Sequence, residues 1–244
     1  MEFKDFYEVC KRIFELNKGL PSLDEKKAEK LYMLTERMLE VNKSMNLTAI
    51  KEEKAIILRH YADSLFVSDY IEQNAKVIDV GCGAGFPTLP LAIFRPDLQI
   101  LALDSTSKRI EYVKQTAKLL ELDNVTAMAE RAETLGNSLD YREKFDYATA
   151  RAVAAMPVLT ELCMPFVRVG GKYVAMKAQK ADEELSLSMG AITKCGGKLN
   201  QTILKPLTDI DNSEENRTLI LVDKIKPTPK EFPRHYSKIS KKPL

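Results

Sequence analysis

One segment constrains the fold more than any other: residues 76–87, in which an apolar run leads directly into three closely spaced glycines. The run Val77–Val80 is rich in β-branched residues, which is typical of a buried parallel strand, and Gly81, Gly83 and Gly85 follow it. Glycines at the end of such a strand allow a sharp turn and a close approach of a ligand to the backbone. We therefore expect an α/β fold with a nucleotide-binding crevice at the carboxyl end of this strand.

Strand and helix patterns alternate through the chain after residue 75. No helical pattern separates the last two strands, so we expect them to form an antiparallel hairpin joined to a parallel sheet. The pattern predicts a doubly wound, Rossmann-like, mostly parallel sheet of seven strands, at residues 76–80, 99–104, 125–128, 145–150, 173–176, 198–204 and 218–222. The helices expected between them lie at residues 87–94, 108–120, 156–167 and 182–193.

The region before the sheet has only helical periodicity. Apolar spacing predicts helices over residues 2–17, 22–41 and 46–70, and Ser22 with Glu25 is a capping-box signature for the second. These observations divide the chain into three parts. We expect a helical extension packed on the core at residues 1–72, the ligand-binding core at 73–225 and a basic tail at 226–244.

The net charge of +2 conceals an asymmetry between this tail and the rest of the chain. Residues 224–244 contain seven Lys or Arg and one acid, a charge of +6, whereas the preceding 223 residues carry 30 bases and 34 acids, a charge of −4. A basic tail on a mildly acidic body suggests contact with an anionic partner. A solvated tail that only aids solubility is the alternative, and charge alone does not decide between them.

Cysteine and histidine usage argues against a metal site. The four cysteines are scattered without a Cys-x-x-Cys pair, and the chain has two histidines. This pattern is typical of reduced thiols in the cytoplasm. The sequence contains no apolar run of the ~20 residues that a membrane-spanning helix needs, and its first residues lack a signal-peptide core. We expect a cytoplasmic protein with neither a metal nor a membrane as partner.

An acidic residue at the end of the second predicted strand is the strongest single candidate for ligand binding. Asp104 follows Gly81 by 23 positions. In a doubly wound sheet a carboxylate at this place lies beside the crevice and accepts hydrogen bonds from a ribose diol. Asp104 could instead cap the next helix, but Ser105 and Thr106 are available for that role, which favours the ribose interpretation.

The glycine spacing distinguishes between nucleotide cofactors. A dinucleotide fingerprint is Gly-x-Gly-x-x-Gly, whereas here the glycines of residues 81–85 alternate and bulky Phe86 and Pro87 follow. Asp79 would add a carboxylate near the turn, which repels a pyrophosphate and suits a cation. S-adenosylmethionine carries a ribose, an adenine and a positive charge without phosphate, so this methyl donor is the expected cofactor. A dehydrogenase is possible only if the turn accepts a pyrophosphate.

The segment Val77–Leu91 resembles motif I of the class I methyltransferases. Further segments resemble the RsmG family, also called glucose-inhibited division protein B, in the same order along the chain: Asn46–Thr48, Arg59–Ser64, Leu103–Ser105, Lys108–Arg109, Arg131–Glu133, Ala150–Ala152 and Met176–Lys177. The resemblance covers residues 40–180, and the end Pro229–Leu244 is similar to the basic ending of Gram-positive members. The chain departs from the family pattern at Thr88, at Ala178 and in the tail segment Arg234–Ile239, where glycines are usual.

This resemblance implies transfer of a methyl group from S-adenosylmethionine to N7 of a guanine in 16S ribosomal RNA, with that RNA or the small ribosomal subunit as partner. Guanine N7 has an exposed lone pair, so the reaction needs an in-line geometry and no general base. No catalytic side chain is therefore expected. Two alternatives are a non-catalytic RNA-binding or ribosome-assembly factor and a small-molecule methyltransferase on the same fold.

The resemblance also implies positions for the cofactor site beyond Asp104. Gly81 and Phe86 would line the turn, and Ala132 and Glu133 would meet the adenine through a backbone N–H and a carboxylate. Arg151 would lie at the mouth of the crevice, where the alternative is a surface arginine paired with Glu133 or Asp146.

Five basic residues are weaker candidates for contact with the RNA backbone, since basic side chains are more often a solvated surface. They are Arg59, Lys108, Arg109, Lys177 and Arg217. His60 is expected to be a packed, hydrogen-bonded histidine rather than a catalyst.

Overall fold

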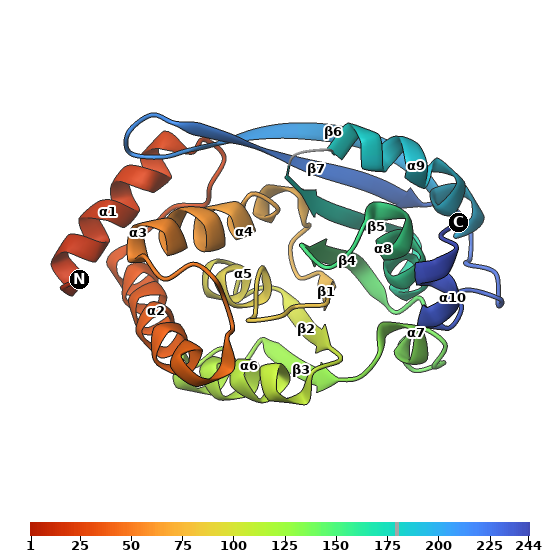
Figure 1. Ribbon diagram of the computed structural model, residues 1–244, viewed down its shortest axis with the longest axis horizontal. Coiled ribbons are helices and arrows are strands. Elements are labelled where there is room, and N and C mark those ends of the chain that lie inside the picture. The colour runs from red at the N-terminus through yellow and green to blue at the C-terminus, as the bar shows by residue number, and fades with distance from the viewer. Residues whose placement is uncertain (179–180) are drawn as a thin grey trace.

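The computed structural model describes residues 1–178 and 181–244 (Figure 1). Its helical segments are α1 (Phe3–Leu16), α2 (Glu25–Met45), α3 (Glu53–Ile56), the π-helical η1 (Ile57–Ala62), α4 (Asp63–Leu65), the 3₁₀ turn η2 (Ser68–Tyr70), α5 (Thr88–Phe94), α6 (Ser107–Leu119), α7 (Ala132–Leu135), α8 (Met156–Cys163), the 3₁₀ turn η3 (Met164–Phe166), α9 (Ala181–Lys194) and α10 (Tyr236–Lys241). Its strands are β1 (Lys76–Val80), β2 (Gln99–Asp104), β3 (Val125–Ala129), β4 (Phe145–Arg151), β5 (Val167–Lys177), β6 (Gly197–Thr208) and β7 (Glu214–Lys224).

The strands of the described residues form one sheet in the order β3-β2-β1-β4-β5-β7-β6. Neighbouring strands from β3 to β5 are parallel, and β7 runs antiparallel to both β5 and β6. This confirms the predicted doubly wound sheet with its antiparallel hairpin. The carboxyl ends of the parallel strands meet at one edge, which is where such sheets bind ligands.

The sheet separates two apolar cores because successive strand side chains point to opposite faces. In β1, Val77 belongs to the core beneath the N-terminal helices, α5 and α6, whereas Ile78 belongs to the core beneath α8, α9 and α10. Both side chains are fully buried. The near-continuous apolar run of β1 is therefore the expected pattern of a strand covered on both faces.

The N-terminal helices are joined to the far end of the β6–β7 hairpin, which extends across the molecule to reach α1 (Figure 1). Asn17 completes the contact: its Nδ2 donates to the Thr208 carbonyl and its Oδ1 accepts from the Thr208 N–H, both at 2.8 Å. At the same place Lys54 Nζ lies 3.0 Å from Asp209 Oδ1. The helical extension therefore packs on the sheet and is also held by its last strands.

Two local predictions in the extension were wrong. The N-cap of α2 is Asp24, whose side chain accepts from Lys27 N, so Ser22 and Glu25 form no capping box. The third helix begins at Glu53 rather than at residue 46. Asn46 adopts φ 49°, and Asn42 bonds both backbone groups of Thr48, so this connection is a hydrogen-bonded loop.

The predicted helix 156–167 was too long at its carboxyl end. It stops at Cys163, a 3₁₀ turn follows, and Val167 is already the first residue of β5. The hairpin strands β6 and β7 are longer than predicted, because their exposed half carries polar residues that weaken the apolar signal. Neither difference changes the topology.

The C-terminal segment, residues 226–244, packs against α8. Glu161 of α8 is fully buried and accepts three hydrogen bonds from Arg234, from the backbone N at 2.8 Å, Nε at 2.8 Å and Nη2 at 2.6 Å. Lys224, just before the segment, is also buried and donates to the Met164 carbonyl at 2.6 Å, and burial lowers its pKa to about 8. Lys224 and Arg234, two of the basic residues counted in the charge of residues 224–244, therefore form hydrogen bonds with other parts of the protein.

The buried Arg234–Glu161 pair should dominate the stability of this region. We expect Arg234→Ala to lower the free energy of unfolding by about 3 kcal/mol, because it leaves Glu161 buried without a partner. The control is Arg12→Ala, which removes the exposed pair of Arg12 with Glu15 and should cost less than about 1 kcal/mol. Urea denaturation of both variants makes the measurement, and equal losses would contradict the prediction.

Candidate cofactor site

A cleft of about 920 Å³ lies at the carboxyl edge of the parallel strands. All six predicted cofactor positions line it: Gly81, Phe86, Asp104, Ala132, Glu133 and Arg151. The floor is formed by the residues that follow β1, β2, β3 and β4. The walls come from segments far away in the sequence, with lining residues that include Leu47, Thr48, Asp63, Arg217 and Tyr236.

The glycine turn after β1 is fixed by backbone hydrogen bonds to β2. The N–H groups of Gly81 and Cys82 both donate to the Leu103 carbonyl, at 2.7 and 3.0 Å. Gly81 has φ 77°, and a Cβ there would lie 2.5 Å from a Val153 methyl group, so a larger residue is excluded. A Cβ on Gly83 would meet only the Gly81 carbonyl oxygen at 4.0 Å, which leaves open cleft for a ligand beside the backbone.

Asp104 joins this turn to the start of α6. Its Oδ2 accepts from the Gly83 N–H at 3.1 Å, and its Oδ1 accepts from the Thr106 N–H at 2.8 Å. Arg109 Nη1 lies 3.7 Å from Oδ2. Asp104 is not the N-cap of α6, which is Thr106; it bonds the N–H of that residue and also lines the cleft. Each carboxylate oxygen can accept a second hydrogen bond, so the ribose role remains open to it.

Asp79 does not face the cleft, which corrects the sequence argument that its carboxylate repels a pyrophosphate there. It is buried behind the turn, where Oδ2 accepts from Thr88 Oγ1 at 2.7 Å and Oδ1 accepts from Thr149 Oγ1 at 3.3 Å. Burial raises its pKa from 3.8 to about 6, although both hydroxyl donors oppose the shift. Thr88, one of the departures from the family pattern, thus anchors Asp79 at the start of α5.

Ala132 and Glu133 begin α7, directly after β3. The first amides of a helix have no partner within it, so this end offers N–H donors to a ligand. The Glu133 side chain is largely buried and forms no ion pair with any described residue. A backbone donor and a carboxylate acceptor therefore lie together on this side of the cleft.

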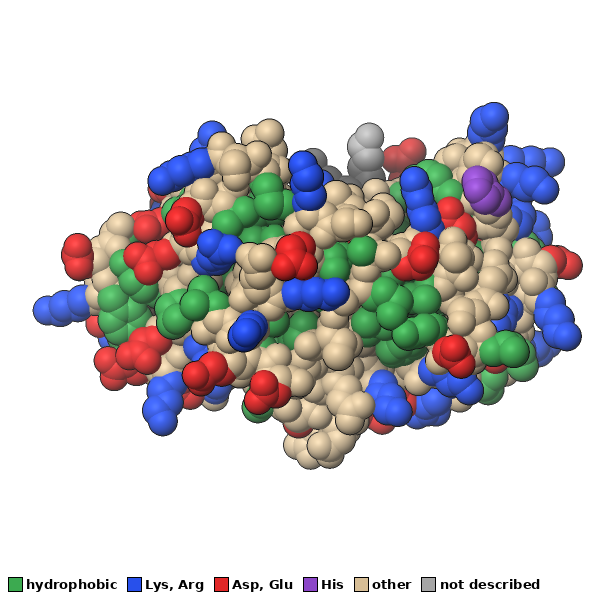
Figure 2. Space-filling model, turned by 90° about the horizontal axis from the view of Figure 1, so that it is seen from below, with side chains coloured by type: hydrophobic (Ala, Val, Ile, Leu, Met, Phe, Trp, Pro, Cys, Tyr) green, Lys and Arg blue, Asp and Glu red, His purple; other side chains and the backbone are tan. Residues whose placement is uncertain are grey.

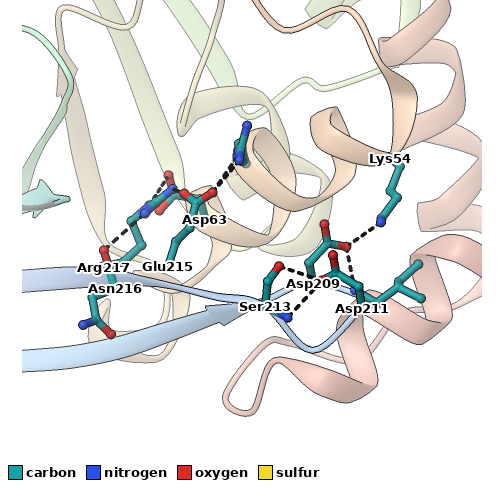
Figure 3. A network of polar contacts seen from close by, with 10 residues as sticks. Lys54, Asp63, Asp209, Asp211, Ser213, Glu215, Asn216 and Arg217 are labelled. Carbon is teal, nitrogen blue, oxygen red and sulfur yellow. Dashed lines mark hydrogen bonds and ion pairs between the residues drawn. The ribbon is translucent and has the colours of Figure 1, made fainter.

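Arg151 ends β4 and is held by the helical extension. Its Nη1 lies 3.1 Å from Asp63 Oδ2 and donates to the Arg59 carbonyl at 3.0 Å. Arg217 of β7 approaches the same Asp63 oxygen with its Nε at 3.3 Å and pairs with Glu215 at 2.8 Å (Figure 3). One carboxylate thus joins the extension, the sheet and the hairpin at the wall of the cleft.

An aromatic stack extends from this ion pair to the glycine turn. The guanidinium carbon of Arg151 lies 5.5 Å from the centre of the Phe86 ring, and the His60 ring stacks on Phe86 with centroids 4.5 Å apart. His60 Nε2 is 2.8 Å from Thr48 Oγ1. Burial and the nearby Arg151 charge lower the pKa of His60 to about 3, so it is neutral and packed, as expected from the sequence.

The five basic candidates for RNA contact occupy different environments. Arg59 and Arg109 are about half exposed at the edge of the cleft, and Lys108 is exposed outside it. Lys177 and Arg217 line the cleft but are mostly buried and ion-paired, Lys177 with Glu184 at 2.6 Å. Of the five, Arg59, Lys108 and Arg109 are the ones with charge accessible to a large partner.

Asp63 and Tyr236 were not singled out by sequence reasoning. Asp63 had a weak signal, because a carboxylate inside the apolar helical run 56–67, four residues after Arg59, needs a partner. Tyr236 had none, since its place beside the cleft depends on how the C-terminal segment folds back. In the described part of the chain no helix is long and apolar enough to cross a membrane, and no cluster of His, Cys, Asp or Glu could hold a metal.

Solved structures with a similar fold include S-adenosylmethionine-dependent methyltransferases. One from Aquifex aeolicus has a TM-score of 0.53 and 12% identity over 72% of this chain and 96% of that one. M. jannaschii TYW2 in complex with AdoMet has a TM-score of 0.50 and 17% identity over 65% of this chain and 73% of that one. At 12–17% identity this likeness shows the fold, which is the class I architecture of these methyltransferases.

Sequence comparison identifies the family. A family model described as "rRNA small subunit methyltransferase G" matches residues 27–208. A curated relative of that name from Alkaliphilus metalliredigens is 41% identical over 91% of this chain and 92% of its own length. Another, from Lactobacillus johnsonii, is 42% identical over 97% of both. The chain belongs to the rRNA small subunit methyltransferase G family, which is the RsmG family that the sequence motifs indicated.

The raised pKa of Asp79 predicts a pH-dependent contribution to stability. Because its folded pKa of about 6 exceeds the ordinary 3.8, the native state holds the proton more tightly, and this stabilisation is lost as pH rises through about 6. Asp79→Asn cannot titrate. We expect the stability of the wild type relative to Asp79→Asn to fall between about pH 4 and 6.5, measured by urea denaturation.

The matched control for this experiment is Asp97→Asn. Arg95 lowers the pKa of Asp97 from 3.8 to about 2, so its contribution is present above 3.8 and is lost as pH falls from there through about 2. The wild-type stability relative to Asp97→Asn should stay flat over the same window. A flat curve for Asp79→Asn as well would show that Asp79 does not titrate there.

The shared carboxylate of Asp63 should control both stability and cofactor affinity. Asp63→Ala removes the partner of two mostly buried arginines and should lower the free energy of unfolding by about 3 kcal/mol. With Arg151 no longer held, we also expect S-adenosylmethionine affinity to fall about tenfold in calorimetry. Glu215→Ala is the control, since Arg217 keeps Asp63 and the lost contacts are more exposed. Equal effects from the two variants would refute the role of Asp63.

Proposed function

We propose that the protein transfers a methyl group from S-adenosylmethionine to N7 of a guanine in 16S ribosomal RNA, acting on that RNA or on the small ribosomal subunit in the cytoplasm. The observation that carries the proposal is the family match, which spans the helical extension from residue 27 and the sheet from β1 to β6. The cleft supports it, because the predicted cofactor positions line one continuous surface.

Asp104 is proposed to hold the ribose. Its two oxygens are oriented by the Gly83 and Thr106 N–H groups, and the side chain is nearly buried, which reduces competition from water. A ribose diol supplies two donors, and a carboxylate oxygen can accept more than one hydrogen bond. The open space beside Gly83 would let the ligand lie close to the backbone.

Ala132 and Glu133 are proposed to bind the adenine. The free amide at the start of α7 can donate to a ring nitrogen, and the Glu133 carboxylate can accept from the exocyclic amine. Gly81 and Phe86 would line the opposite part of the cofactor site at the turn after β1. Their geometry is fixed by the Leu103 carbonyl and by the His60 stack.

The bound cofactor would supply a methyl group activated by a sulfonium charge. The task of the protein is to place guanine N7 in line with that methyl group and to exclude other nucleophiles. Because N7 carries an exposed lone pair, no side chain needs to remove a proton. Arg151 is proposed to position the reactants at the mouth of the cleft, since two acceptors hold its guanidinium in place.

RNA would approach over the exposed basic residues near the cleft. Arg59, Lys108 and Arg109 lie at or near the edge of the cleft. Lys177 and Arg217 would contribute from inside the cleft, where each is ion-paired. Figure 2 shows Lys and Arg side chains gathered at the end where the C-terminal segment lies. Exposed lysines of that segment are Lys226, Lys230, Lys238, Lys241 and Lys242. Such a surface neutralises phosphates and gives salt-dependent affinity.

The direct test is to incubate the protein with methyl-labelled S-adenosylmethionine and either naked 16S RNA or small ribosomal subunits. We expect label in RNA, recovered as 7-methylguanine at one position. Label in another RNA atom would contradict the N7 assignment. RNA binding without any transfer would favour the assembly-factor alternative, and label only in small molecules would favour a small-molecule methyltransferase.

Asp104→Ala tests the cofactor site of this proposal. Removing a carboxylate that accepts from the ribose should weaken S-adenosylmethionine binding about tenfold or more in calorimetry. Asp140→Ala, an exposed acid outside the cleft, is the control and should leave the affinity unchanged. Unchanged affinity in Asp104→Ala would leave Asp104 with only its structural contacts to Gly83 and Thr106.

A further inference from the structure

The C-terminal segment has a fixed course on the protein surface. Arg234 is held by the buried Glu161 through three hydrogen bonds. Arg142 donates to the Phe232 carbonyl at 2.8 Å, and Asn137 Nδ2 donates to the Pro233 carbonyl at 3.1 Å. Side chains on both sides of Arg234 are buried, Phe232 before it and Ile239 in α10 after it. The segment is therefore docked along its length.

These contacts place the segment against the part of the cleft near α7. Asn137 and Gly136 directly follow α7, and a Cβ on Gly136 would lie 3.2 Å from Pro233 Cγ. Figure 1 shows α10 beside α7 and α8. The adenine-binding positions proposed above are the first two residues of α7. The segment thus packs against the element that would hold the adenine.

Tyr236 is the residue of this segment that lines the cleft. It begins α10, two residues after Arg234, and its side chain is 37% exposed. Leu162, the neighbour of Glu161 on α8, lines the same cleft, as do Ala132 and Glu133. No hydrogen bond among the described residues uses the Tyr236 hydroxyl.

We propose that Tyr236 forms the outer wall of the adenine subsite, where its ring packs against the bound adenine of S-adenosylmethionine. The inference rests on the proposed placement of the adenine at Ala132 and Glu133. An aromatic ring presents a flat apolar face, which suits a purine, and its edge can remain in water. The basic C-terminal segment would then be part of the cofactor site as well as a surface for RNA.

This role explains the docking of the segment. An appendage that only attracts phosphates needs exposed charge and no fixed course, whereas a cleft wall must be positioned. The buried pair of Arg234 and Glu161 supplies that position two residues before Tyr236. The exposed lysines of the segment remain available to RNA in either case. Tyr236 could instead stack on the target base of the RNA. The experiment below distinguishes that role from packing against the adenine.

The test is calorimetric titration of the full-length protein with S-adenosylmethionine and, separately, with adenosine. We expect Tyr236→Ala to raise both dissociation constants about tenfold, the typical loss when an aromatic partner of a base is removed. Tyr236→Phe should keep both values within about twofold, because the ring face remains. Lys238→Ala, exposed on the same helix and outside the cleft, should change neither.

A second readout uses the absence of tryptophan from the chain. Tyr236→Trp introduces a single fluorophore whose emission should change saturably with S-adenosylmethionine and with adenosine, and not with methionine. Unchanged dissociation constants in Tyr236→Ala would overturn the inference, whatever the effect of that variant on RNA binding. Emission of Tyr236→Trp that does not change with either ligand would also overturn it. Neither readout involves RNA, so failure to methylate guanine N7 would refute the proposed function without touching this result.

Discussion

The shape of the cleft depends on a single carboxylate, that of Asp63, which lies between two guanidinium groups. Arg151 ends a central strand, and Arg217 lies on the hairpin strand next to the edge of the sheet. All three side chains are only 12–13% exposed, so the attraction is weakly screened and the loss of any partner would be costly. Because Asp63 belongs to the N-terminal extension, the position of Arg151 is determined by a segment outside the sheet. The extension is therefore a structural wall of the cleft.

The sheet could be predicted from the sequence because its signals are local. Apolar runs such as Val77–Val80 are covered on both faces, and the absence of a helical pattern before β7 indicates the antiparallel hairpin. One error occurred where a side chain competes with the helix for backbone hydrogen bonds. Asn42 bonds both backbone groups of Thr48, and this contact replaces the helix that periodicity predicted from residue 46.

The residues of the candidate site also fall into those that local sequence signals could locate and those that they could not. Residues that end strands, such as Asp104 and Arg151, could be located because parallel strands end at a common edge. Asp79 was misplaced because side chains alternate between the two faces of a strand. Its side chain lies on the same face of β1 as Val77, toward α5 and Thr88, and not toward the cleft. Asp63 could not be placed because its partner Arg151 is 88 residues away. Tyr236 could not be placed because its segment is held by Arg234, whose partner Glu161 is 73 residues away, and only the folded chain brings them together.

The floor and the walls of the cleft have different origins, and this difference has a functional consequence. The floor is built by the sheet and its first turns, a framework shared with methyltransferases that are only 12–17% identical to this chain. Such a framework can hold a cofactor but carries no information about the methyl acceptor. The walls come from the N-terminal extension, the hairpin and the C-terminal segment. The Asp63 ion pairs join the extension to β4 and to the hairpin, and the Arg234–Glu161 pair joins the C-terminal segment to α8. Because a rigid wall restricts which acceptor atoms can reach the methyl group in line, selectivity for the substrate must arise mainly from these segments.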